Sequence, residues 1–327
     1  TFAIIERTVT YVEDSRVFRD ETDVKGKISI NCYIEITGTG NLSVLGHYNH
    51  GIISDDSMVI TNGNIKIQAA SNALHANDVI RIKSGDIYII AQSNGIESEK
   101  DIIIDGGTLQ IQAQEDGIHA ENNYTINDGI IDILDSYKAI EAKATITING
   151  GDLTLISSDD AINSGENMDI NGGAIYVDCE GDGFNSNSDM NIAGGDIEVY
   201  AGSNSNGPIN IGDNDNALTI TGGNIFMSGG PMMVTVSSNS TQPTIWIGGN
   251  LSSQSELSIS EDTNQIYNQT LVKSGSLIFY SSDTLKKDIN YTIKTNGNTL
   301  GTATLSSYNV TIGNIQNGLG GTSSQPR

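Results

Sequence analysis

The sequence predicts an all-β protein, a right-handed parallel β-helix in which a single chain winds three strands per 22-residue turn and ends in a C-terminal β cap. Three observations favour this fold. A glycine recurs at a fixed step, as in Gly63, Gly85 and Gly107. Isoleucine-rich pairs follow these glycines. The composition, with 37 Gly, only 4 Pro and many Asn, Ser and Thr, is typical of short strands joined by turns.

Each repeat contains three short apolar segments. The first strand alternates apolar and polar residues, as at Ile65 and Ile67, which indicates one buried face. A second strand is marked by one apolar position, such as Ile96, and a third by pairs such as Ile102 and Ile104. No segment shows the 3.6-residue period of a long helix. The repeat is therefore built from strands alone.

Stacking explains why the repeat is so regular. One repeat cannot bury its own apolar face, whereas stacked repeats share a continuous core. Parallel crossovers are almost always right-handed, so we expect a right-handed coil. A leucine-rich repeat has a similar period, but its Leu and Asn consensus is absent. A β-sandwich would not keep so strict a period.

The rhythm divides the chain into four segments. Residues 1–36 are expected to form N-terminal strands or a first rung, with 1–14 (TFAIIERTVTYVED) as a possible donated or edge strand. Residues 37–230 carry the 22-residue turns. Residues 231–311 are expected to contain the closing turns and a small β cap, because an open β-helix end exposes unpaired strand edges. Residues 312–327 read as a flexible tail.

The net charge of the chain limits the classes of partner that it is expected to bind. The chain has 40 acidic and 16 basic residues, a formal net charge of −24. This argues against nucleic acid and anionic membranes as partners and favours cations. No apolar run reaches the roughly 18 residues of a membrane span. With only 2 Cys, no disulfide framework is indicated. Cys179 falls in a column of small residues that Asp135 interrupts, so we expect a buried thiol.

The bend before each second strand is rich in oxygen ligands. Equivalent residues of stacked turns lie about 4.8 Å apart, so like charges there are costly unless a cation intervenes. Ca²⁺ takes 6–8 oxygens and is the expected cofactor. The predicted metal ligands are Glu97, Glu115, Asp116, His119, Glu141, Asp159, Asp160 and Asp182. Alternatively, Asn and Asp only cap tight turns here. Zinc shared by His75 and His119 is disfavoured because two rungs separate them.

Four turn phrases carry a family resemblance. They are EDGIHAE (115–121), SYKAIEA (136–142), SDDAINS (158–164) and GDGFNSN (181–187). In this order they resemble the calcium-binding, carbohydrate-binding parallel β-helix family related to pectate lyases. The resemblance implies an extracellular or cell-surface protein that binds acidic polysaccharides or cellulose. Lys138 departs from the family, which usually has an acidic residue at that position, so one metal site near it is in doubt.

The predicted sugar-binding residues are Tyr137, Lys138, Asn163 and Asn185. Lys138 is also a weak candidate for the base of a lyase. A lysine among carboxylates has its ammonium form stabilised, which opposes that role. Binding is therefore favoured over a pectate-lyase-like activity. The alternative is a structural subunit of an extracellular filament or matrix, self-associating through the β-helix ends or by strand donation, with calcium as a clamp.

Overall fold

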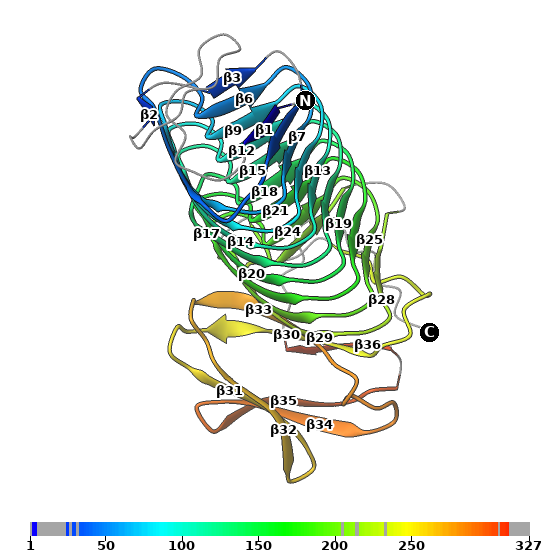
Figure 1. Cartoon of the computed structure of the whole chain (residues 1–327). Helices are drawn as coiled ribbons and strands as arrows, with labels where there is room; N and C mark the ends of the chain where they lie inside the picture. Colours follow the sequence, from blue (N-terminus) through cyan, green and yellow to red (C-terminus); the bar gives the residue numbers. More distant parts are fainter. Residues whose placement is uncertain are drawn as a thin grey trace.

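The computed structural model describes residues 2–4, 24–25, 28–30, 33–203, 206–212, 216–231, 234–306 and 308–313. The chain winds into a long stack of coils, and the C-terminal strands lie at the far end of the stack from the N-terminus (Figure 1). Three parallel sheets run along the stack. They are named here the first, second and third sheets, after the order in which each repeat enters them.

The first sheet carries the longest strands of the coils. Its parallel strands are β2 (Val24–Lys25), β5 (Asn41–Gly46), β8 (Asn64–Ala69), β11 (Asp86–Ala91), β14 (Thr108–Ala113), β17 (Ile130–Asp135), β20 (Asp152–Ser157), β23 (Ala174–Cys179), β26 (Asp196–Tyr200) and β29 (Asn224–Gly229).

The second sheet consists of three-residue strands. These are β3 (Ile28–Ile30), β6 (Ile52–Ser54), β9 (Leu74–Ala76), β12 (Ile96–Ser98), β15 (Ile118–Ala120), β18 (Ile140–Ala142), β21 (Ile162–Ser164), β24 (Phe184–Ser186) and β27 (Ile209–Ile211).

The third sheet is also made of three-residue strands. These are β1 (Phe2–Ile4), β4 (Ile34–Ile36), β7 (Met58–Ile60), β10 (Ile80–Ile82), β13 (Ile102–Ile104), β16 (Tyr124–Ile126), β19 (Ile146–Ile148), β22 (Met168–Ile170), β25 (Met190–Ile192) and β28 (Leu218–Ile220).

Pairing between coils is parallel and in register. Ile96 of β12 pairs with Ile118 of β15, which pairs with Ile140 of β18. Successive coils thus lie directly over one another, and each apolar column becomes a stack of buried side chains, most of them isoleucine. This confirms the parallel β-helix that the 22-residue period predicts. Cys179 lies buried in its column of small residues, and burial raises the pKa of its thiol to about 12.

The recurring glycine has a steric reason. From Gly63 to Gly223 the marker glycines have φ between 96° and 133°, a region that L side chains rarely adopt. A Cβ at Gly107 would also lie 2.8 Å from the carbonyl oxygen of Gly85 in the coil before. The position therefore demands glycine twice over, through its own backbone and through the close stacking of the turns.

The opening segment belongs to the first coil. β1 pairs in parallel with β4, β2 with β5 and β3 with β6. β1 is thus the edge strand of the third sheet, formed within the same chain. The remainder of the 1–14 segment, which the sequence offered as a strand for donation, lies outside the described residues.

The chain reverses after the last coil. β33 (Gly275–Ser281) pairs antiparallel with β29, β30 (Thr244–Leu251) pairs with β33, and β36 (Asn309–Gly313) closes this extension of the first sheet. A separate antiparallel sheet follows the order β32 (Asn264–Thr270), β31 (Glu256–Glu261), β34 (Asn290–Thr295), β35 (Asn298–Thr304). β36 extends two residues into the segment that the sequence assigns to the tail, and residues 314–327 lie outside the described part.

The C-terminal strands also cover part of the outer face of the first sheet. Tyr200 and Phe226 are buried there, and Tyr267 stacks on Phe226 with ring centroids 5.5 Å apart. Lys273 pairs with Asp178 of β23 at 2.6 Å. An apolar outer surface is thereby removed from water and held by an ion pair. Within the described residues no helix has the length and apolar character needed to cross a membrane.

Candidate functional site

A polar wall runs along the outside of the second sheet. It consists of two columns of side chains, one from the bend before each strand and one from the middle of each strand. The turn column is Asn72, Asn94, Asp116, Lys138, Asp160 and Asp182, and the strand column is His75, Glu97, His119, Glu141, Asn163, Asn185 and Asn210. The strand-column residues face outward because their neighbours in sequence on either side face the core.

The turn column forms a ladder of caps. Oδ1 of Asn72 accepts a hydrogen bond from the backbone N–H of Asn94 at 3.1 Å, and Oδ1 of Asn94 accepts from Asp116 at 2.9 Å. Asp160 and Asp182 do the same for Asp182 and Gly207, at 2.7 and 2.6 Å. The interpretation that these Asn and Asp residues cap tight turns is therefore right for the Oδ1 atom of each of the four. The second oxygen of each aspartate remains for other partners.

Lys138 interrupts this ladder. Its N–H is capped by Oδ1 of Asp116 at 3.3 Å, but an ammonium group has no acceptor with which to cap the next coil. Instead Nζ of Lys138 donates to Oε1 of Glu141 at 2.6 Å. Burial alone lowers the pKa of Lys138, but this bond and the nearby carboxylates outweigh it and raise the pKa. Lys138 is therefore held as a cation, which does not suit a general base.

The central section of the wall supplies its own positive charges. Glu141 accepts a hydrogen bond from Nζ of Lys143 at 2.8 Å and lies 3.0 Å from Nδ1 of His119. The same Nδ1 lies 2.9 Å from Oδ2 of Asp116. Burial favours the neutral form of His119, but its hydrogen bonds to Asp116, Glu141 and Glu121 raise its pKa to about 10.

The same contacts act on the carboxylate of Glu141. Burial favours its neutral form, but the bonds from His119, Lys138 and Lys143 lower its pKa far below the ordinary value. Asn163 completes the surroundings, since its Nδ2 donates to Oε1 of Glu141 at 2.9 Å. The charge of Glu141 is thus balanced by side chains of the protein itself.

The C-terminal section contrasts with this. Oδ2 of Asp160 accepts from Nδ2 of Asn185 at 2.8 Å, and Oδ2 of Asp182 accepts from Nδ2 of Asn210 at 3.0 Å. Their partners are neutral amides, and within the described residues neither aspartate forms an ion pair with Lys, Arg or His. Burial, together with the charges of Asp160 and Asp159, raises the pKa of Asp182 to about 6. Among the described residues, neither of these two adjacent carboxylates has a cationic side chain in direct contact with it.

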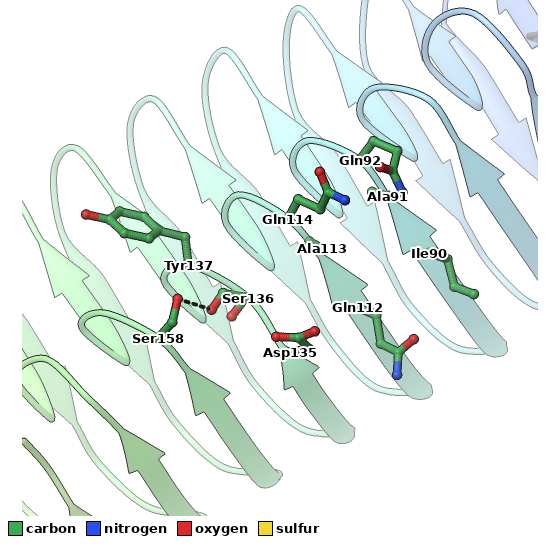
Figure 2. Close-up of a pocket in the computed structure, with 10 residues that line it drawn as sticks. All are labelled: Ile90, Ala91, Gln92, Gln112, Ala113, Gln114, Asp135, Ser136, Tyr137 and Ser158. Carbon is green, nitrogen blue, oxygen red and sulfur yellow. Dashed lines mark hydrogen bonds between the residues drawn. The ribbon is translucent and has the colours of Figure 1, made fainter.

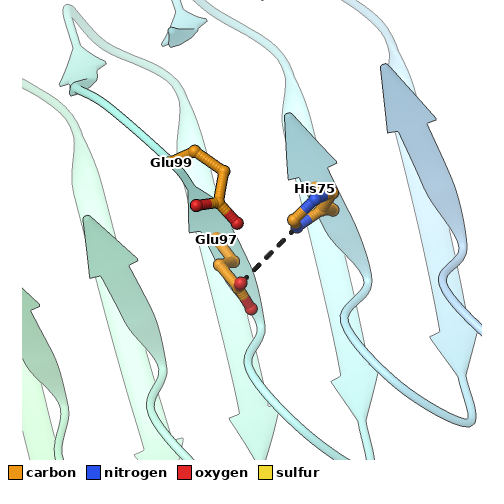
Figure 3. A group of neighbouring side chains, drawn as sticks. All are labelled: His75, Glu97 and Glu99. Atoms are coloured by element: carbon orange, nitrogen blue, oxygen red, sulfur yellow. Dashed lines mark ion pairs between the residues drawn. The ribbon is translucent and has the colours of Figure 1, made fainter. Parts of the chain in front are cut away.

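The N-terminal section consists of His75, Glu97 and Glu99. Figure 3 shows His75 on β9 facing Glu97 on the neighbouring β12, with Glu99 directly after that strand. Nδ1 of His75 lies 3.6 Å from Oε1 of Glu97. One ligand atom from each of the three residues can be chosen so that all lie within 4.8 Å of one another.

A groove opens beside the wall, where the first sheet turns toward the second. It has a volume of about 540 Å³, and its lining includes Ile90, Gln92, Gln112, Gln114, Asp135, Tyr137 and Ser158. Figure 2 shows these side chains arrayed over neighbouring coils, with the Tyr137 ring projecting from the turn. Half of the Tyr137 surface is exposed. Amides, hydroxyls and an open aromatic ring thus share one concave surface.

A bulge in β17 shapes this groove. Ile111 pairs with Ile133, but Gln112 pairs with Asp135, so β17 has one extra residue relative to β14. Asp135 consequently faces solvent while Ser136 is buried. A bulge re-aims side chains in this way, and bulges are common beside functional sites. Asp135 is the residue that breaks the column of small residues in the sequence, and the bulge is the reason.

The predicted site residues fall into distinct places. Asp116, His119 and Glu141 come together in the central section, Asp160 and Asp182 lie in the C-terminal section, and Glu97 lies apart from both. Glu115 accepts a hydrogen bond from Ser93 at the edge of the wall.

Asp159 and Tyr137 link the wall to the groove. The Tyr137 hydroxyl bonds to the carboxylate of Asp159, which raises the pKa of Tyr137. Of the predicted sugar-binding residues, Tyr137 lines the groove, while Lys138, Asn163 and Asn185 engage the carboxylates of the wall.

Sequence reasoning missed several residues. Asn210 belongs to the wall and Glu99 lies beside it, directly after β12, and their places in the repeat could have revealed them. Gln92, Gln112 and Gln114 line the groove. Glutamines at outward positions carry no special mark in the sequence, so only the structure identifies them as a group.

The fold and these surfaces define a β-helical protein with an extended polar face. The chain belongs to the family of carbohydrate-binding domain-containing proteins, whose model matches residues 2–180. A solved structure of a polysaccharide lyase-like protein from C. thermocellum, in a gadolinium derivative, is similar with a TM-score of 0.49 and 17% identity, covering 65% of this chain and 96% of that chain. No curated protein matches the sequence.

Proposed function

We propose that this chain is an extracellular, non-catalytic protein that binds acidic polysaccharides or cellulose with the help of Ca²⁺. The observation that carries the proposal is an amide-lined groove that reaches the coil of Asp160, a residue that, like Asp182, contacts neutral amides and, among the described residues, no cationic side chain. Family membership supports carbohydrate as the ligand class, and the family match covers the groove and Asp160.

The C-terminal section is suited to a hard cation. Asp160 and Asp182 each use Oδ1 to cap the next coil and direct Oδ2 outward. The amides of Asn185 and Asn210 contact these outer oxygens at 2.8 and 3.0 Å. Rotation of either amide would replace its NH₂ group with an oxygen. Ca²⁺ is bound by carboxylate, amide and water oxygens, about 6–8 of them at roughly 2.3–2.6 Å. These residues would therefore hold Ca²⁺.

The groove supports sugar binding. Amides of Gln92, Gln112 and Gln114 both donate and accept hydrogen bonds, which matches the hydroxyl groups of a sugar. The exposed ring of Tyr137 offers an apolar face with a polar tip, suited to a pyranose ring. Ca²⁺ beside the groove would neutralise a uronate carboxylate, so that an acidic polymer could approach a chain of net charge −24.

A binding role is preferred to catalysis on physical grounds. β-Elimination from a uronate needs a neutral amine or another base to remove a proton. Lys138 donates to Glu141 at 2.6 Å, and its raised pKa keeps the ammonium form at neutral pH.

Calorimetric titration tests the proposal. We expect Ca²⁺ to bind with a Kd of roughly 10⁻⁵–10⁻³ M, and polygalacturonate or cellulose to be retained more strongly with Ca²⁺ than with chelator. Asp160→Asn should weaken Ca²⁺ binding, whereas Asp152→Asn, an exposed carboxylate on the first sheet, serves as the matched control. Equal Ca²⁺ affinity in the two variants would reject this metal site. Sedimentation of the same samples separates binding from Ca²⁺-driven polymerisation, the outcome expected of a filament subunit.

A further inference from the structure

We propose that His75, Glu97 and Glu99 form a second metal site, selective for a divalent transition-metal ion of the Zn²⁺ type. This inference goes beyond Ca²⁺-dependent sugar binding and does not depend on it. A donor set of one imidazole nitrogen and two carboxylate oxygens suits Zn²⁺ and its neighbours better than Ca²⁺, which takes oxygen ligands.

The first argument is the orientation of His75. Its Nε2 lies 3.3 Å from Oδ1 of Asn77, an oxygen that can only accept a hydrogen bond. Nε2 therefore carries the proton in the neutral ring, and Nδ1 presents its lone pair. His75 is only 8% exposed, and among the described residues its Nδ1 has no hydrogen-bond partner. The ring stacks on that of His50, with the two centroids 4.9 Å apart.

The second argument is the orientation of Glu97. Nδ2 of Asn72 and Nδ2 of Asn94 both donate to Oε2, the latter at 2.8 Å. Two amides thus fix one oxygen of the carboxylate and leave Oε1 directed at Nδ1 of His75, 3.6 Å away. Two ligand atoms at about 2.1 Å from one ion with tetrahedral geometry lie roughly 3.4 Å apart. Metal ligands are typically oriented by hydrogen bonds from neighbouring groups in this way.

The third argument compares two coils of the same wall. Glu97 and Glu141 occupy the same column, two coils apart. Glu141 is flanked by Lys138 three residues before and Lys143 two residues after, and both ammonium groups contact it. At the corresponding positions Glu97 has Asn94 and Glu99. The backbone positions are equivalent, but an amide stands in place of the first ammonium group and a further carboxylate in place of the second. A bound cation would supply the missing positive charge.

Glu99 completes the site from its open side. It is exposed, and one of its oxygens lies within 4.8 Å of the chosen atoms of His75 and Glu97. To bind a common ion, this exposed side chain would turn toward the other two ligands. Three protein ligands leave a fourth position directed at solvent, which water or an oxygen of a sugar would occupy.

Zn²⁺ titration in saturating Ca²⁺ tests the proposal, because Ca²⁺ fills any site made of oxygens alone. The wild-type chain should bind one Zn²⁺ ion, and Co²⁺ in its place should give visible absorption bands of a low-coordinate nitrogen and oxygen site. His75→Ala should weaken binding on the order of a hundredfold. His47→Ala, which removes an exposed histidine, should leave it unchanged.

Glu99→Lys is the sharper variant, because it places an ammonium group beside Glu97 as Lys143 does beside Glu141, and it should fold while losing Zn²⁺. Retention of Zn²⁺ by folded Glu99→Lys or His75→Ala, or no stoichiometric binding by the wild type, would overturn the proposal. Asp182→Asn should leave Zn²⁺ affinity unchanged, so failure of the Ca²⁺ site and failure of this one are distinguishable.

Discussion

Oδ1 of Asp160 accepts a hydrogen bond of 2.7 Å from the backbone N–H of Asp182, a residue 22 positions later in the chain. The bond joins adjacent coils and places the two carboxylates one above the other. The cap that closes each coil is therefore also the reason that negative charge accumulates along the wall. Structure and ligand binding depend on the same side chains, and the predictions below separate the two roles.

In metal-free protein, the contribution of Asp182 to the free energy of unfolding should fall as pH rises from 4 to 7. The pKa of Asp182 is about 6 in the folded chain, above the value of about 3.9 expected when unfolded. The folded state therefore binds more protons in this window, and the stability gained from protonation is lost as pH passes through about 6.

Asp182→Asn should flatten this dependence and raise the free energy of unfolding at pH 7 by about 1–3 kcal/mol. Urea denaturation in the absence of Ca²⁺ measures both effects. An unchanged pH profile in the variant would show that Asp182 is not the titrating group.

Lys138→Met should destabilise the coil. The substitution keeps the apolar stem but removes the ammonium that donates to Glu141 at 2.6 Å. Glu141 is buried and would keep only Lys143 and His119 as cationic partners, so we expect a loss of about 1–3 kcal/mol in the free energy of unfolding. Lys100→Met, which breaks a solvent-exposed pair with Asp78, should have a much smaller effect on stability. Equal losses in the two variants would contradict this account.

Tyr137→Ala should weaken sugar binding alone. The ring lines the groove and half of its surface is exposed, so its removal should lower polysaccharide affinity about tenfold, or about 1.4 kcal/mol. Affinity electrophoresis on acidic and neutral polymers measures the change. Tyr48→Ala is the control, because Tyr48 is 98% exposed and does not line the groove. A parallel loss in Tyr48→Ala would point to a different binding surface.

Ile140→Ala should test the shared core. The side chain is fully buried between Ile118 and Ile162 of the adjacent coils. Truncation leaves a cavity and should lower the free energy of unfolding by about 2–5 kcal/mol. Ile156→Ala, at an outward position that is 38% exposed, should change it by less than about 1 kcal/mol. Thermal unfolding followed by circular dichroism compares the two.

Most of the fold was predictable because the residues that define each turn recur at a constant spacing that can be read directly from the sequence. The φ of each marker glycine and the alternation of residues such as Ile65 and Ile67 depend only on neighbouring residues and on stacking at a constant step. The wall was predictable for the same reason, since a residue and its equivalent 22 positions on must share a column. The bulge at Asp135 left only an irregular residue in the sequence, with no indication of the groove it creates.

The sequence by itself determined the coil, its pitch and the columns of side chains, because a repeated pattern of buried and turn residues buries its apolar face only when equivalent residues stack over one another. Only the tertiary structure decided which carboxylates are neutralised and which are not. Glu141 is compensated by Lys138, Lys143 and His119, whereas Asp160 and Asp182 contact neutral amides. Electrostatic balance depends on distances of a few ångströms between side-chain atoms on different coils. An alignment of the repeats in the sequence does not give these distances.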